Sequence, residues 1–225
     1  MRSTEGATAR GRFITLEGPD GSGKTSQAAQ LAEALRARGH DVVLAREPGG
    51  TRLGERLREI LNSPSGPPIA PLADASLFSA ARAQHVIEVI RPALEHGRHV
   101  VCARYADSTL AYQGYGAGYP VATLRELQEV ATGGLWPQRT ILLDLPAEVG
   151  LERKPVDDQT RWEIGLDLDY HRRVRAGFLE LAAAEPSRWA VVDADREPEA
   201  VFRDVLATAL NALDEPDALP VRMKG

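Results

Sequence analysis

Short apolar runs alternate along this chain with longer stretches in which apolar residues recur at helical spacing. The short runs predict β-strands, because they are too short and too rich in β-branched residues to stand as helices. The longer stretches predict crossover helices between parallel strands. The expected strands are residues 12–17, 41–45, 99–102, 138–144 and 189–192. The expected helices are residues 24–38, 51–61, 71–95, 121–131, 170–184 and 197–213.

This alternation predicts an α/β fold in which a five-stranded parallel sheet is flanked by helices in three layers. A chain of 225 residues is long enough for one such domain and short for two. We expect the domain to span residues 12–213. The polar residues 1–11 are expected to form a flexible leader, and residues 214–225, with two prolines and mixed charge, a flexible tail.

Composition narrows the classes of function. The apolar fraction of 43% and the charged fraction of 26% are ordinary for a globular protein, and no apolar run approaches the length of a membrane span. The N-terminal residues lack the apolar segment of a secretory signal, so we expect a cytoplasmic protein. The net charge of −5 argues against a broad nucleic-acid surface. Cys102, the single cysteine, lies in an apolar run and is expected to be buried without chemistry of its own.

The strongest chemical motif lies between the first expected strand and the first expected helix. It fits the pattern G-x-x-x-x-G-K-[ST], whose backbone N–H groups surround phosphate oxygens. Lysine at its end reaches the β and γ phosphates, and the hydroxyl that follows binds Mg²⁺. The expected ATP-binding residues are Gly18, Pro19, Asp20, Gly21, Ser22, Gly23, Lys24 and Thr25. The sequence therefore predicts a P-loop nucleotide-binding protein.

A P-loop alone is compatible with GTPases, ATPases, nucleotide kinases and transport ATPases. GTPases normally carry an N-K-x-D motif, and the two asparagines here, Asn62 and Asn211, are followed by serine and alanine. Asp144 ends an apolar strand, where it is expected either to bind Mg²⁺ or to cap a helix.

Three sequence motifs farther along the chain have no role in a protein that only hydrolyses ATP. Arg46-Glu47-Pro48-Gly49-Gly50-Thr51 follows the second expected strand, where a doubly wound sheet presents its ligands, although a turn with a Thr51 cap explains part of it. Phe78 and Arg82 are four residues apart and so lie on one face of a helix, where they can offer an aromatic ring and a guanidinium to a base. The alternative is that Phe78 is a core residue and Arg82 is a solvated arginine. The segment 104–114 follows the third expected strand and contains an arginine that can bind a phosphate at the sheet edge.

With these strings the chain resembles bacterial thymidylate kinases from about residue 12 to residue 213, in the order and spacing of its motifs. The resemblance implies phosphorylation of dTMP to dTDP by ATP, with Mg²⁺ as cofactor, in dTTP biosynthesis. It also implies a homodimer packed through long helices and a lid at about residues 153–163. The expected catalytic residues are Lys24, Arg104, Arg153 and Arg161. The expected dTMP-binding residues are Asp20, Arg46, Glu47, Phe78, Arg82, Arg104, Ser108, Tyr112 and Gln113. The expected metal ligands are Thr25 and Asp20.

The chain departs from the family pattern at two places. Family members usually carry aspartate before the arginine and tyrosine that follow the third strand, and this chain has Ala103. Asp107 or Asp144 could substitute for that carboxylate. The lid also lacks the usual arginine-rich run. A kinase for another pyrimidine monophosphate, or a nucleotide-binding homologue with weakened catalysis, therefore stays open beside the dTMP kinase.

Overall fold

The fold is built around one parallel sheet. The computed structural model describes residues 10–153, 160 and 166–215. Within them five strands run in the order β2-β3-β1-β4-β5. The strands are β1 (Phe13–Glu17), β2 (Val42–Arg46), β3 (His99–Ala103), β4 (Arg139–Asp144) and β5 (Trp189–Asp193). Each matches an expected strand to within one residue at either end.

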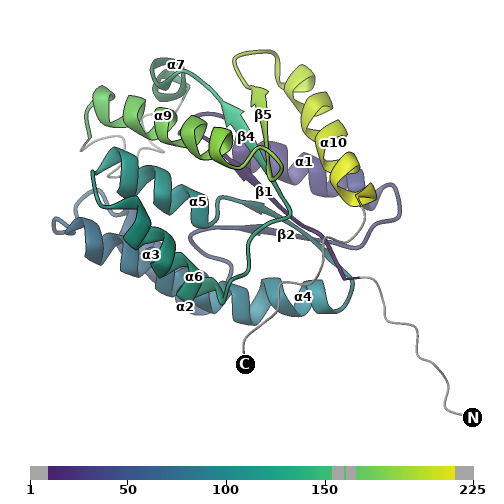
Figure 1. The fold of residues 1–225 in the computed structure, drawn as a ribbon, viewed down its shortest axis with the longest axis horizontal. Helices are drawn as coiled ribbons and strands as arrows, with labels where there is room; N and C mark the ends of the chain where they lie inside the picture. The colour runs from purple at the N-terminus through teal and green to yellow at the C-terminus, as the bar shows by residue number, and fades with distance from the viewer. Residues whose placement is uncertain (1–9, 154–159, 161–165, 216–225) are drawn as a thin grey trace, which may run out of the picture.

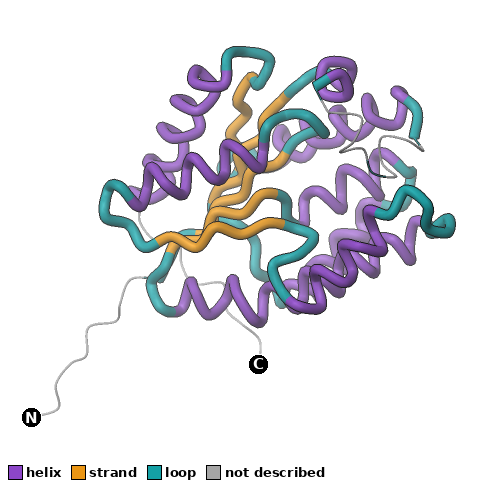
Figure 2. The backbone as a smooth tube through the Cα atoms, turned by 180° about the vertical axis from the view of Figure 1, so that it is seen from behind, coloured by secondary structure: helices purple, strands orange, loops and turns teal. Residues whose placement is uncertain are grey.

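Helices cover both faces of this sheet (Figures 1 and 2). On one face lie α1 (Lys24–Arg36) and α10 (Pro198–Asp214), which pack on each other. The remaining segments are α2 (Arg52–Asn62), α3 (Pro71–His85), the π-helix η1 (Val86–Ile90), α4 (Arg91–Glu95), α5 (Ala106–Thr109), the π-helix η2 (Leu110–Gly116), α6 (Val121–Thr132), α7 (Ala147–Glu152) and α9 (Leu168–Ala184). The three-layer α/β architecture expected from the sequence is confirmed.

The core explains why the central strand β1 carries apolar side chains on both faces. Alternate residues of β1 point to opposite faces: Ile14 and Leu16 join the cluster that includes α1 and α10, and Phe13 joins the cluster under η1 and α4. All five residues of β1 are buried. A strand covered on both faces needs apolar side chains on both, as parallel sheets generally do.

Two helical segments were not expected from the sequence. Residues 106–116 form α5 and η2, and residues 147–152 form α7. Both are short, and the first contains Gly114 and Gly116, which lower helix propensity, so neither shows a clear helical period. The expected helix 71–95 is present as α3, η1 and α4 in direct succession, with a π-helical turn in its middle.

The strand register brings the chemical motifs to one edge of the sheet. Leu16 at the end of β1 pairs with Ala103 at the end of β3, and Ala103 pairs in turn with Arg46 at the end of β2. The P-loop, the Arg46 string and Arg104 therefore leave the sheet side by side. No helix in the described part of the chain is long and apolar enough to cross a membrane. The proposed leader and tail fall largely outside the described residues, and those boundaries stay predictions.

Candidate active site

The P-loop has the backbone that its glycines predict. Gly18, Gly21 and Gly23 have φ values of 147°, 75° and 84°. A Cβ on Gly21 would lie 2.0 Å from the carbonyl oxygen of Gly150, and one on Gly18 would lie 2.4 Å from that of Leu143. Only glycine fits these positions, since both space and φ exclude a side chain. The loop ends at the N-terminus of α1, where backbone N–H groups and the helix dipole favour an anion.

Lys24 lies inside this loop. Its side chain is 6% exposed, and its Nζ donates to the carbonyl of Pro19 at 2.5 Å and to Ser22 Oγ at 3.1 Å. An ammonium held against neutral oxygens can exchange them for phosphate oxygens, which make stronger charge-assisted bonds. The expected position of Lys24 at a phosphate site is consistent with this geometry.

Arg104 occupies an unusual turn at the end of β3. Its φ is 67°, the only positive φ at a non-glycine residue among those described. Its guanidinium bonds Asp20 of the P-loop, the Tyr112 hydroxyl at 3.2 Å and Ser108 Oγ at 3.3 Å. It also lies over the Tyr112 ring, 4.9 Å from the centroid. Burial alone would lower the pKa of Arg104, but Tyr112, Asp20 and Glu17 raise it, so the group stays a cation.

A pocket opens beside this arginine, next to the P-loop. It is lined by Asp20, Glu47, Pro48, Arg58, Asn62, Phe78, Arg104, Ser108, Thr109, Tyr112, Gln113 and Thr160. Seven of the nine residues expected to bind dTMP line this pocket, so segments far apart in sequence converge on it. The two expected residues that do not line it are Arg46 and Arg82.

Arg46 faces a neighbouring groove instead, which Thr25 and Ala103 also line. Its Nη2 donates to both carboxylate oxygens of Glu55, at 3.0 and 3.1 Å. Arg58, about one turn after Glu55 on α2, lines the pocket and donates to the carbonyl of Pro48 at 3.0 Å. Burial and the nearby Arg46 and Arg104 lower the pKa of Arg58, which indicates crowded positive charge that an anion would relieve.

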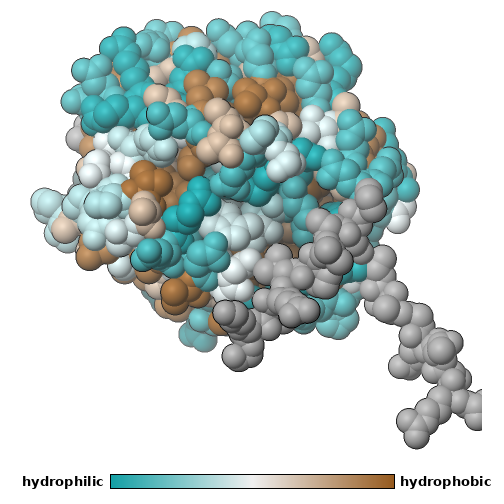
Figure 3. Space-filling view, viewed as in Figure 1, coloured by the Kyte–Doolittle hydropathy of each residue, from teal (hydrophilic) through white to brown (hydrophobic). Residues whose placement is uncertain are grey.

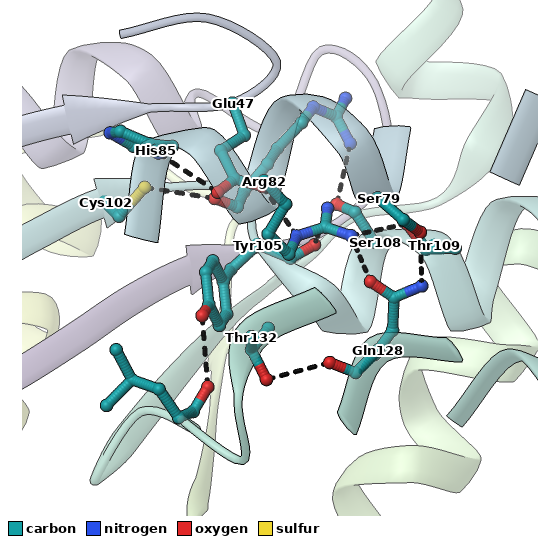
Figure 4. A network of polar contacts seen from close by, with 12 residues as sticks. Glu47, Ser79, Arg82, His85, Cys102, Tyr105, Ser108, Thr109, Gln128 and Thr132 are labelled. Atoms are coloured by element: carbon teal, nitrogen blue, oxygen red, sulfur yellow. Dashed lines mark hydrogen bonds and ion pairs between the residues drawn. The ribbon is translucent and has the colours of Figure 1, made fainter. Parts of the chain in front are cut away.

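Arg82 does not line the pocket and lies instead in a network of polar contacts, with Glu47, Thr109 and Gln128 around its guanidinium (Figure 4). The side chain is 2% exposed. Its guanidinium donates to Glu47 Oε2 at 2.7 Å, to Thr109 Oγ1 at 3.0 Å and to the carbonyl of Tyr105 at 2.9 Å. Gln128 on α6 accepts a further bond. All these bonds are internal, so in this structure Arg82 fixes two pocket-lining residues, Glu47 and Thr109, and its direct contact with a base stays a prediction.

Phe78 and Gln113 form the part of the pocket suited to a base. Phe78 on α3 lines the pocket, and the stacking of its ring on a base stays a prediction. Gln113 is 2% exposed and its amide Nε2 donates to Asp74 Oδ2 at 2.9 Å. That bond fixes which way the amide faces, which is what selective hydrogen bonding requires. Asp74 was not singled out from the sequence.

The two carboxylates considered as substitutes for the acid missing at Ala103 are both engaged by arginines. Asp107 is fully buried and bonds Arg188 at 2.7 and 2.9 Å. Asp144 bonds Arg175 at 2.8 and 2.9 Å. The expectation that Asp144 caps a helix is wrong, because Pro146 precedes α7 and no side chain caps it. Thr51, by contrast, does cap α2, accepting from Gly54 N.

The donor set fits a magnesium ion brought by a nucleotide better than a metal held by the protein alone. No group of three or more His, Cys, Asp or Glu residues in the described part of the chain could hold a metal. Mg²⁺ in phosphoryl-transfer sites typically takes one or two protein oxygens and fills the rest of its shell with phosphates and water. The hydroxyl of the exposed Thr25, at the start of α1, and the carboxylate of Asp20 in the P-loop are oxygens of that kind.

The expected lid is only partly described. Arg153 directly follows α7 and bonds the carbonyl of Ala194 and the carboxylate of Asp195, both at 3.0 Å. It does not line the pocket, and its role as a closing cation stays a prediction. Arg161 lies outside the described residues, while Thr160 beside it lines the pocket.

The sequence alone assigned no role to Arg58, which lines the pocket, or to Glu17, which lies behind it. Arg58 carried a weak signal, an arginine on the helix that follows the Arg46 string. Glu17, at the end of β1, accepts from Tyr105 N and from Ser108 Oγ, both at 2.6 Å. Burial and the charge of Asp107 raise the pKa of Glu17 to about 7, against the opposing effects of Ser108 and Arg104.

A P-loop at the carboxyl edge of a parallel sheet, with a second pocket of arginines and an aromatic ring beside it, defines the class of P-loop nucleotide kinases. The comparisons narrow that class. The family model described as Thymidylate kinase matches residues 16–205. The chain belongs to the thymidylate kinase family, and it is a nucleoside monophosphate kinase.

The sequences of individual thymidylate kinases align with this chain over most of its length. The chain is 52% identical to the thymidylate kinase of Thermomicrobium roseum over 202 residues, which are 89% of this chain and 95% of that protein. It is 52% identical to that of Deinococcus radiodurans over 198 residues, 88% of this chain and 96% of the relative. The crystal structure of thymidylate kinase from Ehrlichia chaffeensis matches with a TM-score of 0.73 and 33% identity, covering 89% of this chain and 99% of that one.

Proposed function

We propose that this protein transfers the γ-phosphoryl group of ATP to dTMP, giving ADP and dTDP. The observation that carries the proposal is the pocket beside the P-loop. Asp20 belongs to both, so an acceptor in the pocket lies next to a donor in the loop. Arg58 and Arg104 supply charge for the acceptor's phosphate, and Phe78 supplies a ring for its base. Family membership supports dTMP as the acceptor.

The catalytic work of the chain is alignment and charge neutralisation. Phosphoryl transfer needs little covalent chemistry from the protein, and the enzyme gains rate mainly by holding the two phosphates in line and stabilising spread negative charge. Lys24 would leave Pro19 and Ser22 to bind the β and γ phosphates of ATP. Arg104 and Arg58 would hold the phosphate of dTMP against the γ phosphate. Mg²⁺, when bound with ATP at Thr25 and Asp20, supplies further positive charge.

The experiment that tests the acceptor is a competition assay. Equal concentrations of dTMP, dUMP, UMP and CMP are incubated with the enzyme, Mg²⁺ and limiting ATP, and the diphosphate products are separated and quantified. We expect dTDP to dominate, because Phe78 and the fixed Gln113 amide recognise the base. Preferential formation of any other diphosphate would contradict dTMP as the substrate.

We also propose that the protein is a homodimer. Its described surface carries exposed apolar side chains on one pair of packed helices, Leu53 and Ile60 on α2 and Leu72 on α3, with Ile87 on the adjoining η1. Figure 3 shows the apolar surface on one face of the molecule as separate patches among polar side chains. Light scattering is expected to give twice the mass of the 24.4 kDa chain, and a monomer mass would contradict the proposal.

A further inference from the structure

The turn that carries Arg104 is held at three points around one strained residue. The Arg104 N–H donates to the carbonyl of Leu16 at 3.0 Å, and the Arg104 carbonyl accepts from the Cys102 thiol at 3.2 Å. The next N–H, of Tyr105, donates to Glu17 Oε1 at 2.6 Å. A residue with a Cβ adopts a φ of 67° at an energetic cost, and the structure around it must hold it there. Glu17 supplies the one charge-assisted bond among the three.

Glu17 also holds a side chain that touches the Arg104 guanidinium. Its second carboxylate oxygen accepts from Ser108 Oγ at 2.6 Å, and Ser108 Oγ in turn accepts from Arg104 Nη1 at 3.3 Å. One carboxylate thus fixes both the backbone that directs Arg104 and a contact at the tip of its side chain. Glu17 is fully buried and does not line the pocket, so it reaches the substrate only through these neighbours.

We propose that Glu17 is a positioning residue for the acceptor phosphate, acting through Arg104. The proposal rests on the proposed function, in which Arg104 binds the phosphate of dTMP. Glu17 contributes to recognition of the phosphate and not to recognition of the nucleoside.

A neutral side chain of the same shape cannot replace this carboxylate. Both Glu17 oxygens accept hydrogen bonds, whereas glutamine offers one acceptor and one donor. In Glu17→Gln the amide nitrogen must donate to Ser108, which reverses the direction of that bond. Glutamine removes a buried charge and keeps the volume, so we expect the variant to fold. Wild type and Glu17→Gln should be compared at pH 8. Burial raises the pKa of Glu17 to about 7, so its carboxyl group is mostly ionised at that pH.

Calorimetric titration at pH 8 with dTMP and with thymidine, which lacks the phosphate, tests the proposal. Loss of a charge-assisted hydrogen bond is worth about a tenfold to hundredfold change in affinity, so we expect Glu17→Gln to weaken dTMP binding by that factor. Thymidine affinity should stay within about twofold, because the pocket for the nucleoside is intact. The matched control is Glu129→Gln, which alters an exposed glutamate on α6 that accepts from Trp136. It should leave both affinities unchanged.

The double variant shows whether the effect passes through Arg104. In an Arg104→Ala background, Glu17→Gln should cause no further loss of dTMP affinity, because interacting residues are not additive. Equal weakening of dTMP and thymidine, unchanged dTMP affinity in Glu17→Gln, or additive losses in the double variant would each overturn the positioning role. A wild-type protein that does not phosphorylate dTMP would overturn the proposed function instead, and the turnover assay separates that failure from this one.

Discussion

Replacing Lys24 with alanine is expected to lower kcat by about a thousandfold or more while the fold is retained. Lys24 is the one lysine inside the P-loop, and its ammonium is already confined by Pro19 and Ser22 at the place where phosphates enter. Removing one preorganised charge from a site that stabilises developing negative charge typically costs a factor of about 10² to 10³, and phosphoryl transfer depends on such charges more than most reactions. Coupled detection of ADP with saturating ATP and dTMP measures the loss.

A matched control distinguishes this loss from a general effect of charge. Arg38→Ala removes a cation just beyond the other end of α1, where the side chain is exposed and bonds only the carbonyl of Ala34 among the described contacts. Its kcat should remain within about twofold of wild type, as for most exposed surface positions. Turnover by Lys24→Ala within tenfold of wild type would contradict the assignment of this loop as the donor site.

Replacing Arg104 with alanine is expected to lower kcat/KM for dTMP by about a hundredfold to a thousandfold. The guanidinium faces the pocket from a fixed turn, with Asp20, Tyr112 and Ser108 as partners. Alanine and arginine bear the same steric cost at a positive φ, so the substitution removes the cation without changing the strain of the turn. Initial rates over a range of dTMP concentrations measure the effect, and KM for ATP should change far less.

Lysine at position 104 is expected to restore little of this activity, because a point charge on a flexible stem does not reproduce a planar, multiply bonded guanidinium. The control is Arg98→Ala, which removes an exposed arginine paired with Asp41 at the opposite edge of the sheet. Full activity of Arg104→Ala, or equal losses in Arg104→Ala and Arg98→Ala, would remove Arg104 from the acceptor site.

The parts of the molecule that follow from local sequence could be predicted. The five strands are predicted by short apolar runs. The P-loop is predicted by glycines that lie within a few residues of one another. The same holds for Thr51, which caps α2 because its hydroxyl accepts from Gly54 N, three residues along the chain. The strings that contain Phe78, Tyr112 and Gln113 indicated a second nucleotide site, and the resemblance to a family assigned these residues to one thymidine pocket.

The parts that depend on long-range pairing could not be predicted. Whether Arg46 or Arg58 faces the pocket depends on Glu55, whose two carboxylate oxygens accept from Arg46 Nη2. Asp107 was a plausible substitute for the carboxylate missing at Ala103, yet Arg188, 81 residues away, bonds both of its oxygens. The sequence names the charged residues, and only the fold decides which of them neutralise one another.

The measurement that tests the central claim most directly is the rate of ADP and dTDP formation by wild-type protein with ATP, Mg²⁺ and dTMP. We expect dTMP-dependent turnover at about 1 to 100 per second, typical of kinases, with equal amounts of the two products. This rate would show that Ala103, where relatives were expected to carry an acid, does not prevent transfer. Tight binding of dTMP with no dTDP formed would contradict the account. Restoration of transfer by Ala103→Asp would then identify a nucleotide-binding homologue that has lost efficient catalysis at this position.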